Sequence, residues 1–257
     1  MSRIEIVAIG TCIFSSIVFL AGCNNSLQKN SRPKIDRNEI VKINTELGLS
    51  YMQNNQFSDA EEKLNKALRI NPRNADTLNA MALLKSKTNQ QEEAIYYFRK
   101  AIKLDRSDPA INNNYGQYLC AIGSHKEGIY YLKIAIKNYE IRNKTIAYFN
   151  AGICAAASGD LDYAASNMTN ALNIDENYGP ALLELSSLMI KIGNYNEAEL
   201  LLGRFNKLSK ATASSLYNAY LISEKKGYIN ESKKLKILLK NLFPLSEEFK
   251  KINEKSQ

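Results

Sequence analysis

The stretch LGLSYMQNNQFSDAEEKLNKALRINP, residues 47–72, decides the fold. It contains two apolar patterns of helical spacing, separated by a polar run and ended by Pro72, which cannot continue a helix. The second pattern places Ala60, Leu64 and Ala67 on one face. We therefore expect two helices joined by a short turn.

This helical pair recurs along the chain. One small side chain of the second helix returns after 34, 34 and 36 residues, as Ala67, Ala101, Ala135 and Ala171. Another series runs in step, as Ala60, Ala94, Gly128, Ala164 and Ala198. Small residues at a crossing allow two helices to approach closely. A fixed period in this range is typical of stacked helical pairs that bury their apolar faces only against neighbours. We predict an all-α, right-handed α-solenoid of about six repeats in residues 41–246.

Each unit resembles the tetratricopeptide repeat. In the first unit the expected positions are held by Leu47-Gly48, Tyr51, Ala60, Ala67 and Pro72, while Asn44 stands where the family usually has tryptophan. The repeats are predicted at 41–74, 75–108, 109–142, 145–178, 179–212 and 213–246. Two extra residues near 139–144 lengthen the exit from the third. Phe205 stands where the fifth repeat should have a small residue, and the sixth repeat is the most degenerate, as a capping repeat would be.

The N-terminus is predicted to be a targeting segment. Residues 6–20 are mostly apolar and uncharged, which is short for a membrane span and suits the core of a signal peptide. Leu20-Ala21-Gly22-Cys23 resembles a bacterial lipobox. The resemblance implies removal of residues 1–22 and lipid attachment to Cys23, with two or more chains giving a stable anchor. The alternative is an uncleaved anchor that ends at a chance cysteine.

The residue after the cysteine bears on location. In the sorting rule that the resemblance implies, Asp at that position favours the inner membrane, so Asn24 favours the periplasmic face of the outer membrane. The polar residues 23–40 are predicted to be a flexible tether. Residues 247–257 are predicted to be a C-terminal tail.

The charge balance, 34 Lys and Arg against 26 Asp and Glu, gives +8 and permits contact with nucleic acid or an anionic membrane. We interpret it as an ordinary solvated surface, since the basic residues are spread along the helices apart from short runs such as Lys233-Lys234 and Lys236. No nucleic-acid partner is expected.

Catalytic patterns are absent from the sequence. The only histidine, His125, is predicted to lie in a turn, and we find no phosphate-binding glycine loop, metal-spaced Cys/His cluster or nucleophile motif. We therefore expect no enzyme activity, cofactor, metal site or small-molecule substrate.

Two cysteines remain beside Cys12, in the signal segment, and Cys23. Cys120 and Cys154 are 34 residues apart, in the first helices of the third and fourth repeats, which should be neighbours. An exported protein meets an oxidising compartment. A disulfide at this junction and two buried free thiols both remain open.

A partner is expected on the concave face, which the first helix of each repeat should line. One position per repeat contributes Leu49, Leu83, Gln117, Ile153, Ser187 and Leu221, with Met52 and Phe149 one turn away and Asn79 and Asn113 recurring on the same face. A groove of this composition favours a partner helix with apolar anchors. The alternative for each residue is packing between helices.

The combination of lipobox and repeats resembles the PilF/PilW type IV pilus biogenesis lipoproteins. The similarity is carried by INTELGLSYM (43–52), NPRNAD (71–76), NNYG (113–116) with Leu119-Cys120, and PALLEL (180–185). It implies a pilotin, which binds the pilus secretin subunit and promotes its outer-membrane localisation and multimerisation, with Leu49, Met52 and Leu83 as candidate anchors. The alternative is a general scaffold lipoprotein for cell-envelope assembly.

Overall fold

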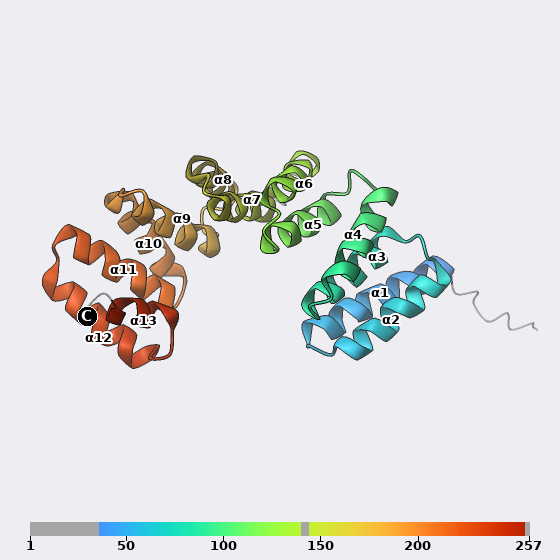
Figure 1. The fold of residues 1–257 in the computed structure, drawn as a ribbon, viewed down its shortest axis with the longest axis horizontal. Helices are drawn as coiled ribbons and strands as arrows, with labels where there is room; N and C mark the ends of the chain where they lie inside the picture. Colours follow the sequence, from blue (N-terminus) through green and yellow to red (C-terminus); the bar gives the residue numbers. More distant parts are fainter. Residues whose placement is uncertain (1–35, 140–143, 255–257) are drawn as a thin grey trace, which may run out of the picture. The chain divides into compact units, whose positions relative to one another are not determined.

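The computed structural model describes residues 36–139 and 144–254, and these form helices and connecting turns without a strand (Figure 1). The first three pairs are α1 (Arg37–Gln53) and α2 (Phe57–Ile70), α3 (Ala75–Lys87) and α4 (Gln91–Leu104), and α5 (Pro109–Ala121) and α6 (His125–Asn138). The next three are α7 (Lys144–Ser158) and α8 (Leu161–Ile174), α9 (Gly179–Lys191) and α10 (Tyr195–Leu208), and α11 (Ala213–Lys226) and α12 (Ile229–Leu242), followed by α13 (Glu247–Glu254).

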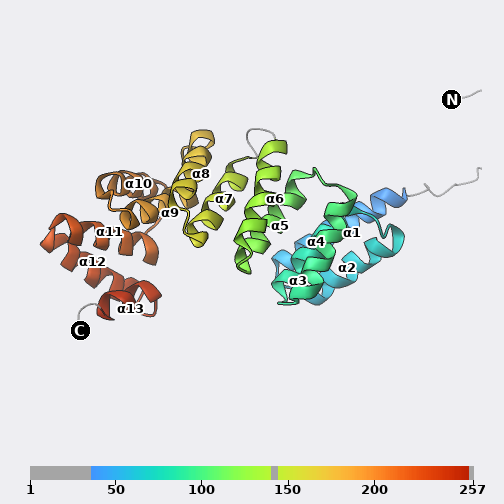
Figure 2. The ribbon, with the colours of Figure 1, turned by 45° about the horizontal axis from the view of Figure 1, so that its top comes forward.

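The helices pack as a succession of pairs. The two helices of each pair lie against each other, and each second helix also contacts the first helix of the next pair (Figure 2). First helices of consecutive pairs touch directly, from α1 with α3 to α9 with α11. The all-α tetratricopeptide-repeat solenoid expected from the period is therefore confirmed.

The recurring small residues lie where helices cross. Ala60, Ala67 and their counterparts in the inner repeats are fully buried. A Cβ atom added to Gly48 would stand 2.6 Å from Leu64, and one added to Gly116 would stand 2.7 Å from Leu132. No side chain fits at that separation, so the close approach of the paired helices requires these glycines.

The turn inside each repeat has its own requirement. One residue per turn adopts a positive φ, as Asn55, Asn89, Gly123, Gly159, Gly193 and Gly227. Only glycine, and less often asparagine, enters this region at low cost. The same turn is thus built six times with one of two residue types.

Phe205 fills a position that is small in the other repeats, and its ring packs beside Gly179. Its ring is 6% exposed and lies in the core shared by the fourth and fifth repeats. A Cβ atom on Gly179 would lie 3.7 Å from that ring, in ordinary contact. The fifth repeat has therefore exchanged one small side chain for a large one without opening the stack.

A buried lysine joins the first two repeats. Lys85 is 6% exposed, and its ammonium group lies 2.8 Å from a carboxylate oxygen of Glu61 and 3.1 Å from one of Glu93. These two hydrogen bonds outweigh the effect of burial and raise the pKa of Lys85. The lysine therefore stays charged inside the helix stack.

Two predicted boundaries need correction. The predicted tether reaches residue 40, but α1 begins at Arg37 with Asp36 as its capping residue, whose side chain accepts a hydrogen bond from the Asn38 amide. The predicted C-terminal tail contains α13, in which Ile252 is fully buried against Leu216 and Leu239. This short helix therefore completes the core of the last pair with Ile252.

Several predictions fall outside the described residues. These are the signal peptide, Cys23, the tether up to residue 35, and the lengthened exit at residues 140–143. Within residues 36–139 and 144–254, no helix combines the length and apolar character needed to cross a bilayer.

Candidate partner-binding face

The first helices are joined side by side by polar contacts. Hydrogen bonds cross four of their junctions: Thr45 to Thr77 at 2.7 Å, Asn114 to Asn79 at 3.4 Å, Asn150 to Asn113 at 3.0 Å, and Asn218 to Ser187 at 2.8 Å. Each links one first helix to the next, and most of these groups are buried. We call the exposed side of α1, α3, α5, α7, α9 and α11 the first-helix face.

Asn79 and Asn113 belong to these junctions. The side-chain oxygen of Asn113 accepts the Asn150 amide in a bond that is buried on both sides, and Asn113 is only 7% exposed. Asn79 accepts a longer bond, 3.4 Å, from Asn114. Of the alternatives left by the sequence, packing between helices applies to Asn113.

Met52 is also a core residue, and its prediction as a groove anchor is wrong. It is 5% exposed and packs against Ala60, Leu64 and Met81. Its place three residues after Leu49 turns it about 60° around the helix axis, toward the second helix of its own repeat. Leu49 and Leu83 are half-buried against the same cluster and keep part of their surface in solvent.

Helix α7 carries three accessible apolar side chains on the first-helix face, and α1 carries Ile43 and Leu47, which are 45% and 42% exposed. Ile153 is 37% exposed, and Phe149 is half-buried with its ring edge-on to Tyr178 at 5.4 Å. Ile146 is 54% exposed and was not among the groove residues predicted from the sequence. Its spacing of three and seven residues from the other two places it on the same side of α7 and could have revealed it. We call Ile146, Phe149 and Ile153 the α7 stripe.

Polar groups flank this stripe. Gln117, on the neighbouring helix α5, is exposed as predicted for a groove residue. On the other side, α9 carries Glu184 at the place where other repeats have Asn114, Asn150 or Asn218. Burial by its surroundings raises the pKa of the Glu184 carboxyl, and it makes no side-chain hydrogen bond within the described residues. An apolar stripe beside an unpaired carboxylate suits a partner segment with apolar anchors and a cation.

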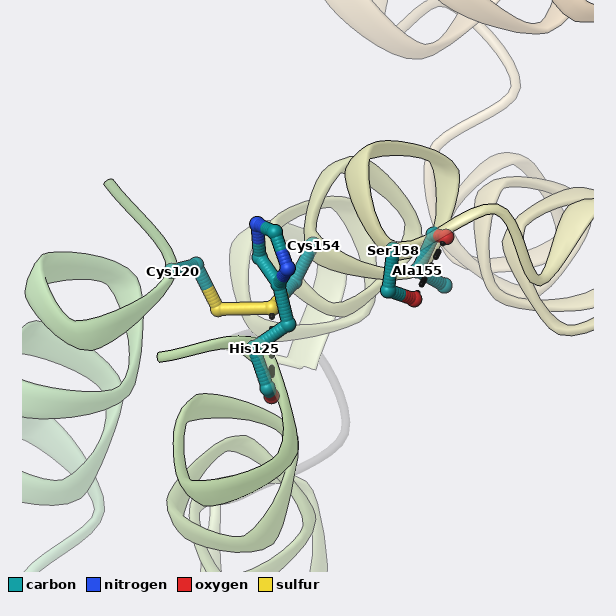
Figure 3. The surroundings of a disulfide bond; sticks show 5 residues. All are labelled: Cys120, His125, Cys154, Ala155 and Ser158. Carbon is teal, nitrogen blue, oxygen red and sulfur yellow. Dashed lines mark hydrogen bonds between the residues drawn. A yellow bond between two sulfur atoms is a disulfide. The ribbon is translucent and has the colours of Figure 1, made fainter. Parts of the chain in front are cut away.

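Cys120 and Cys154 join α5 to α7 behind the stripe. The structure places them in a disulfide with an S–S distance of 1.99 Å and Cα atoms 5.4 Å apart (Figure 3). The main-chain oxygen of His125, the first residue of α6, lies 3.6 Å from the Cys154 sulfur. Since a disulfide sulfur has no hydrogen to donate, this is a packing contact. Gly128 lies against Cys120, and an added Cβ would come within 2.4 Å of its sulfur.

Titratable side chains do not gather into a metal-binding group. Within the described part of the chain no three His, Cys, Asp or Glu side chains are close enough to hold an ion together. A cleft of about 410 Å³ lies between α10, α11 and α12, lined by apolar and small polar side chains and by Glu199 and Glu231.

Comparison with known proteins gives the family of the fold. The chain matches the tetratricopeptide repeat over residues 41–74, 63–96 and 155–207. It is 25% identical over 238 residues to the type IV pilus assembly protein PilF of Pseudomonas aeruginosa, covering 92% of this chain and 94% of that protein.

Two solved structures have the same fold. Pseudomonas aeruginosa PilF superimposes with a TM-score of 0.78 at 24% identity, over 85% of this chain and 99% of that one. PilW, described as a widely conserved type IV pilus biogenesis factor, gives 0.77 at 24% identity, over 83% of this chain and 98% of that one. The chain is a PilF/PilW-like tetratricopeptide-repeat protein.

Proposed function

We propose that this protein acts in type IV pilus biogenesis as a pilotin, a lipoprotein that binds the pilus secretin and brings it to the outer membrane. The observation that carries the proposal is the extent of the match to PilF, 92% of this chain and 94% of PilF, which is long enough to reach all six helical pairs. A match confined to the repeats of one region would support only a generic binding scaffold.

The lipobox-like residues Leu20-Ala21-Gly22-Cys23 supply the membrane part of the proposal. Lipid on Cys23 would hold the solenoid at the periplasmic face of the outer membrane, since two or more acyl chains give stable anchoring. In this mechanism the secretin has no need of its own anchor, because the lipid on Cys23 of the bound pilotin holds it at the membrane. A Cys23→Ala variant should therefore leave the secretin away from the outer membrane in fractionated cells.

The secretin segment is proposed to bind on the first-helix face at the α7 stripe. Ile146 and Ile153 are accessible, and Leu49 and Leu83 extend the apolar surface on α1 and α3. Glu184 would pair with a lysine or arginine of the same segment, and this cation would compensate for the hydration that the carboxylate loses to its surroundings. Apolar anchors with one charged contact are the recognition pattern of a helix in a groove.

The binding face is tested by capture of the secretin from detergent-solubilised outer membranes. The double variant Ile146→Glu, Ile153→Glu places charges on exposed positions, so the fold should persist while capture falls by at least ten-fold. The matched control is Leu200→Glu, at a residue on second helix α10 that is 71% exposed, and it should bind normally. Circular dichroism and the urea midpoint confirm that both variants are folded.

Two results would contradict the proposal at different points. Normal capture by the double variant would remove the α7 stripe from the mechanism while keeping the pilotin function. Recovery of other envelope assembly proteins, with no secretin from any variant or from the wild type, would instead favour the general scaffold function.

A further inference from the structure

The positive charge of this protein is concentrated in its last helical pair and the segment that leads to it. Residues 36–203 contain 18 Lys and Arg against 20 Asp and Glu, whereas residues 204–240 contain nine against two. The short basic runs at Lys233-Lys234 and Lys236, noted in the sequence as the exception to a spread of charge, belong to this excess. Apolar exposure follows the charge: of 15 large hydrophobic residues that are exposed in the described structure, eight lie between Leu200 and Leu245.

The second helix of the last pair reverses the pattern of the five before it. Lys236 occupies a position that is buried and apolar in the earlier repeats, as Leu64, Phe98, Leu132, Met168 and Leu202. Lys240 occupies one that holds Leu68, Ile102, Ile136, Leu172 and Asn206. Between them, Ile237 stands where the earlier repeats have Asn65, Arg99, Lys133, Thr169 and Gly203.

Capping explains only half of this reversal. The last repeat is followed only by the short helix α13, so lysines at positions that pack against the next repeat elsewhere suit the end of the stack. Solubility does not explain why Ile237, at a position that is polar or glycine elsewhere, is apolar and 59% exposed. Nor does it explain Leu245, which is 88% exposed in the turn after α12. A surface that serves only as a cap would be polar at both of these places.

The alternation of lysines and exposed aliphatic side chains matches the boundary of an anionic bilayer. Lysine stems lie along apolar material while their ammonium groups reach phosphates. Exposed isoleucine and leucine side chains enter the region between headgroups and acyl chains. Between Ile229 and Ser246 the only acid is Glu231, which turns toward α10 and lines the cleft there. Glu247 and Glu248 follow directly after this stretch, but Glu247 is paired with Lys250 and Glu248 accepts a hydrogen bond from Ser214.

We propose that α12 and the turn after it rest on a bilayer surface that contains anionic phospholipid. The contact is made by Lys233, Lys234, Ile237 and Lys240, which helical spacing places on one side of α12, and by Leu245 in the turn that follows; we call these residues the basic apolar face. It is a second membrane contact, separate from any lipid on Cys23 and from the secretin site on α7. It would hold the C-terminal pair against the membrane and restrict the orientations of the tethered solenoid.

The chain contains no tryptophan, so a single introduced tryptophan is a clean reporter. Ile237→Trp places it on the basic apolar face, and Tyr130→Trp places it on second helix α6 at almost the same exposure, 59% against 60%. Full-length protein is reconstituted in phosphatidylcholine vesicles with and without phosphatidylglycerol, and quenching by brominated acyl chains is measured. We expect several-fold stronger quenching, with a blue shift, for Ile237→Trp in the phosphatidylglycerol vesicles alone.

Charge reversal completes the test. Adding Lys233→Glu and Lys240→Glu to the Ile237→Trp protein should reduce quenching to the level of Tyr130→Trp. The matched control, Lys126→Glu with Lys137→Glu on α6, changes the net charge equally and should leave quenching unchanged. Equal quenching of the two reporters, or equal quenching in vesicles without phosphatidylglycerol, overturns the proposal. A surface that instead binds an acidic protein gives no quenching at either position and also overturns it.

Discussion

Two glycines in the interior of second helices should respond in opposite directions to the same substitution. Gly128 lies in α6 and Gly203 in α10. In an exposed helix interior, replacing glycine by alanine stabilises by about 1 kcal/mol, because glycine has more backbone freedom to lose on folding. This gain is common to both positions, so any difference between them reports the surroundings of the new methyl group.

Those surroundings differ sharply. A Cβ on Gly128 would stand 2.4 Å from the Cys120 sulfur and 2.8 Å from the carbonyl oxygen of Gly116, whereas a Cβ on Gly203 would have no atom within 4 Å. Forcing a methyl group into a packed core costs about 1–3 kcal/mol. Gly128→Ala should therefore lose about 1 kcal/mol net, and Gly203→Ala should gain about 1 kcal/mol, a gap of about 2 kcal/mol.

Urea unfolding of both variants and the wild type, followed by circular dichroism at one protein concentration, measures the gap. Equal m-values are needed, because a solenoid that loses cooperativity would shift its midpoint for another reason. Reduction of the disulfide should lessen the Gly128→Ala penalty only in part, since the sulfur can then move but the Gly116 carbonyl cannot. Stabilisation by both substitutions would refute the close packing of α5 and α6.

The remaining predictions concern charge and covalent linkage. A disulfide that closes a loop of 34 residues stabilises by up to about 4 kcal/mol, so Cys120→Ala with Cys154→Ala should lower the urea midpoint strongly, and dithiothreitol should lower it in the wild type alone. Burial raises the pKa of Glu184, so the folded state binds this proton more tightly than the unfolded state and loses stability as the pH rises above the ordinary pKa of 4.5. The Glu184→Gln variant should therefore be more stable than the wild type at pH 7 and equally stable at acidic pH. A stability difference that does not change with pH would exclude this cause. Lys85→Met should change the free energy of unfolding by less than about 1 kcal/mol, because methionine keeps the packing of the aliphatic part of the lysine side chain and both glutamate partners are exposed enough to be solvated. A loss several times larger would show that the charge itself holds the first two repeats together.

The sequence was sufficient to predict the six helical pairs and where their helices cross, because each repeat carries the same pattern, although it missed the start of α1, the helix α13 and the place of His125 at the start of α6. Ala67 and its counterparts mark the crossings because a larger group would separate the helices. Asn55 and Gly123 mark the turns because a positive φ admits few residue types. Because the pattern occurs six times, a departure in one repeat does not obscure the positions of its helices.

The binding face was harder to predict, because a period identifies equivalent residues without giving the direction in which they point. Met52 and Ile153 both follow the repeat pattern, yet one is 5% and the other 37% exposed. Successive side chains point about 100° apart around a helix, so a small rotation of the helix decides whether a given side chain is buried or exposed. Asn113 was misplaced for a related reason: its buried partner Asn150 lies 37 positions away, across a junction where the repeat length changes.

The disulfide and the α7 stripe are adjacent in the chain, and this relates the fold to the proposed function. Ile153 faces solvent, while the next residue, Cys154, is fully buried and bonded to α5. The two extra residues of the chain fall between these helices, where a longer connection would otherwise give α7 more freedom. A covalent link behind the stripe holds Ile146, Phe149 and Ile153 in one arrangement before a partner arrives, which lowers the entropy lost on binding. The disulfide therefore fixes the helix that carries the α7 stripe of the proposed partner site.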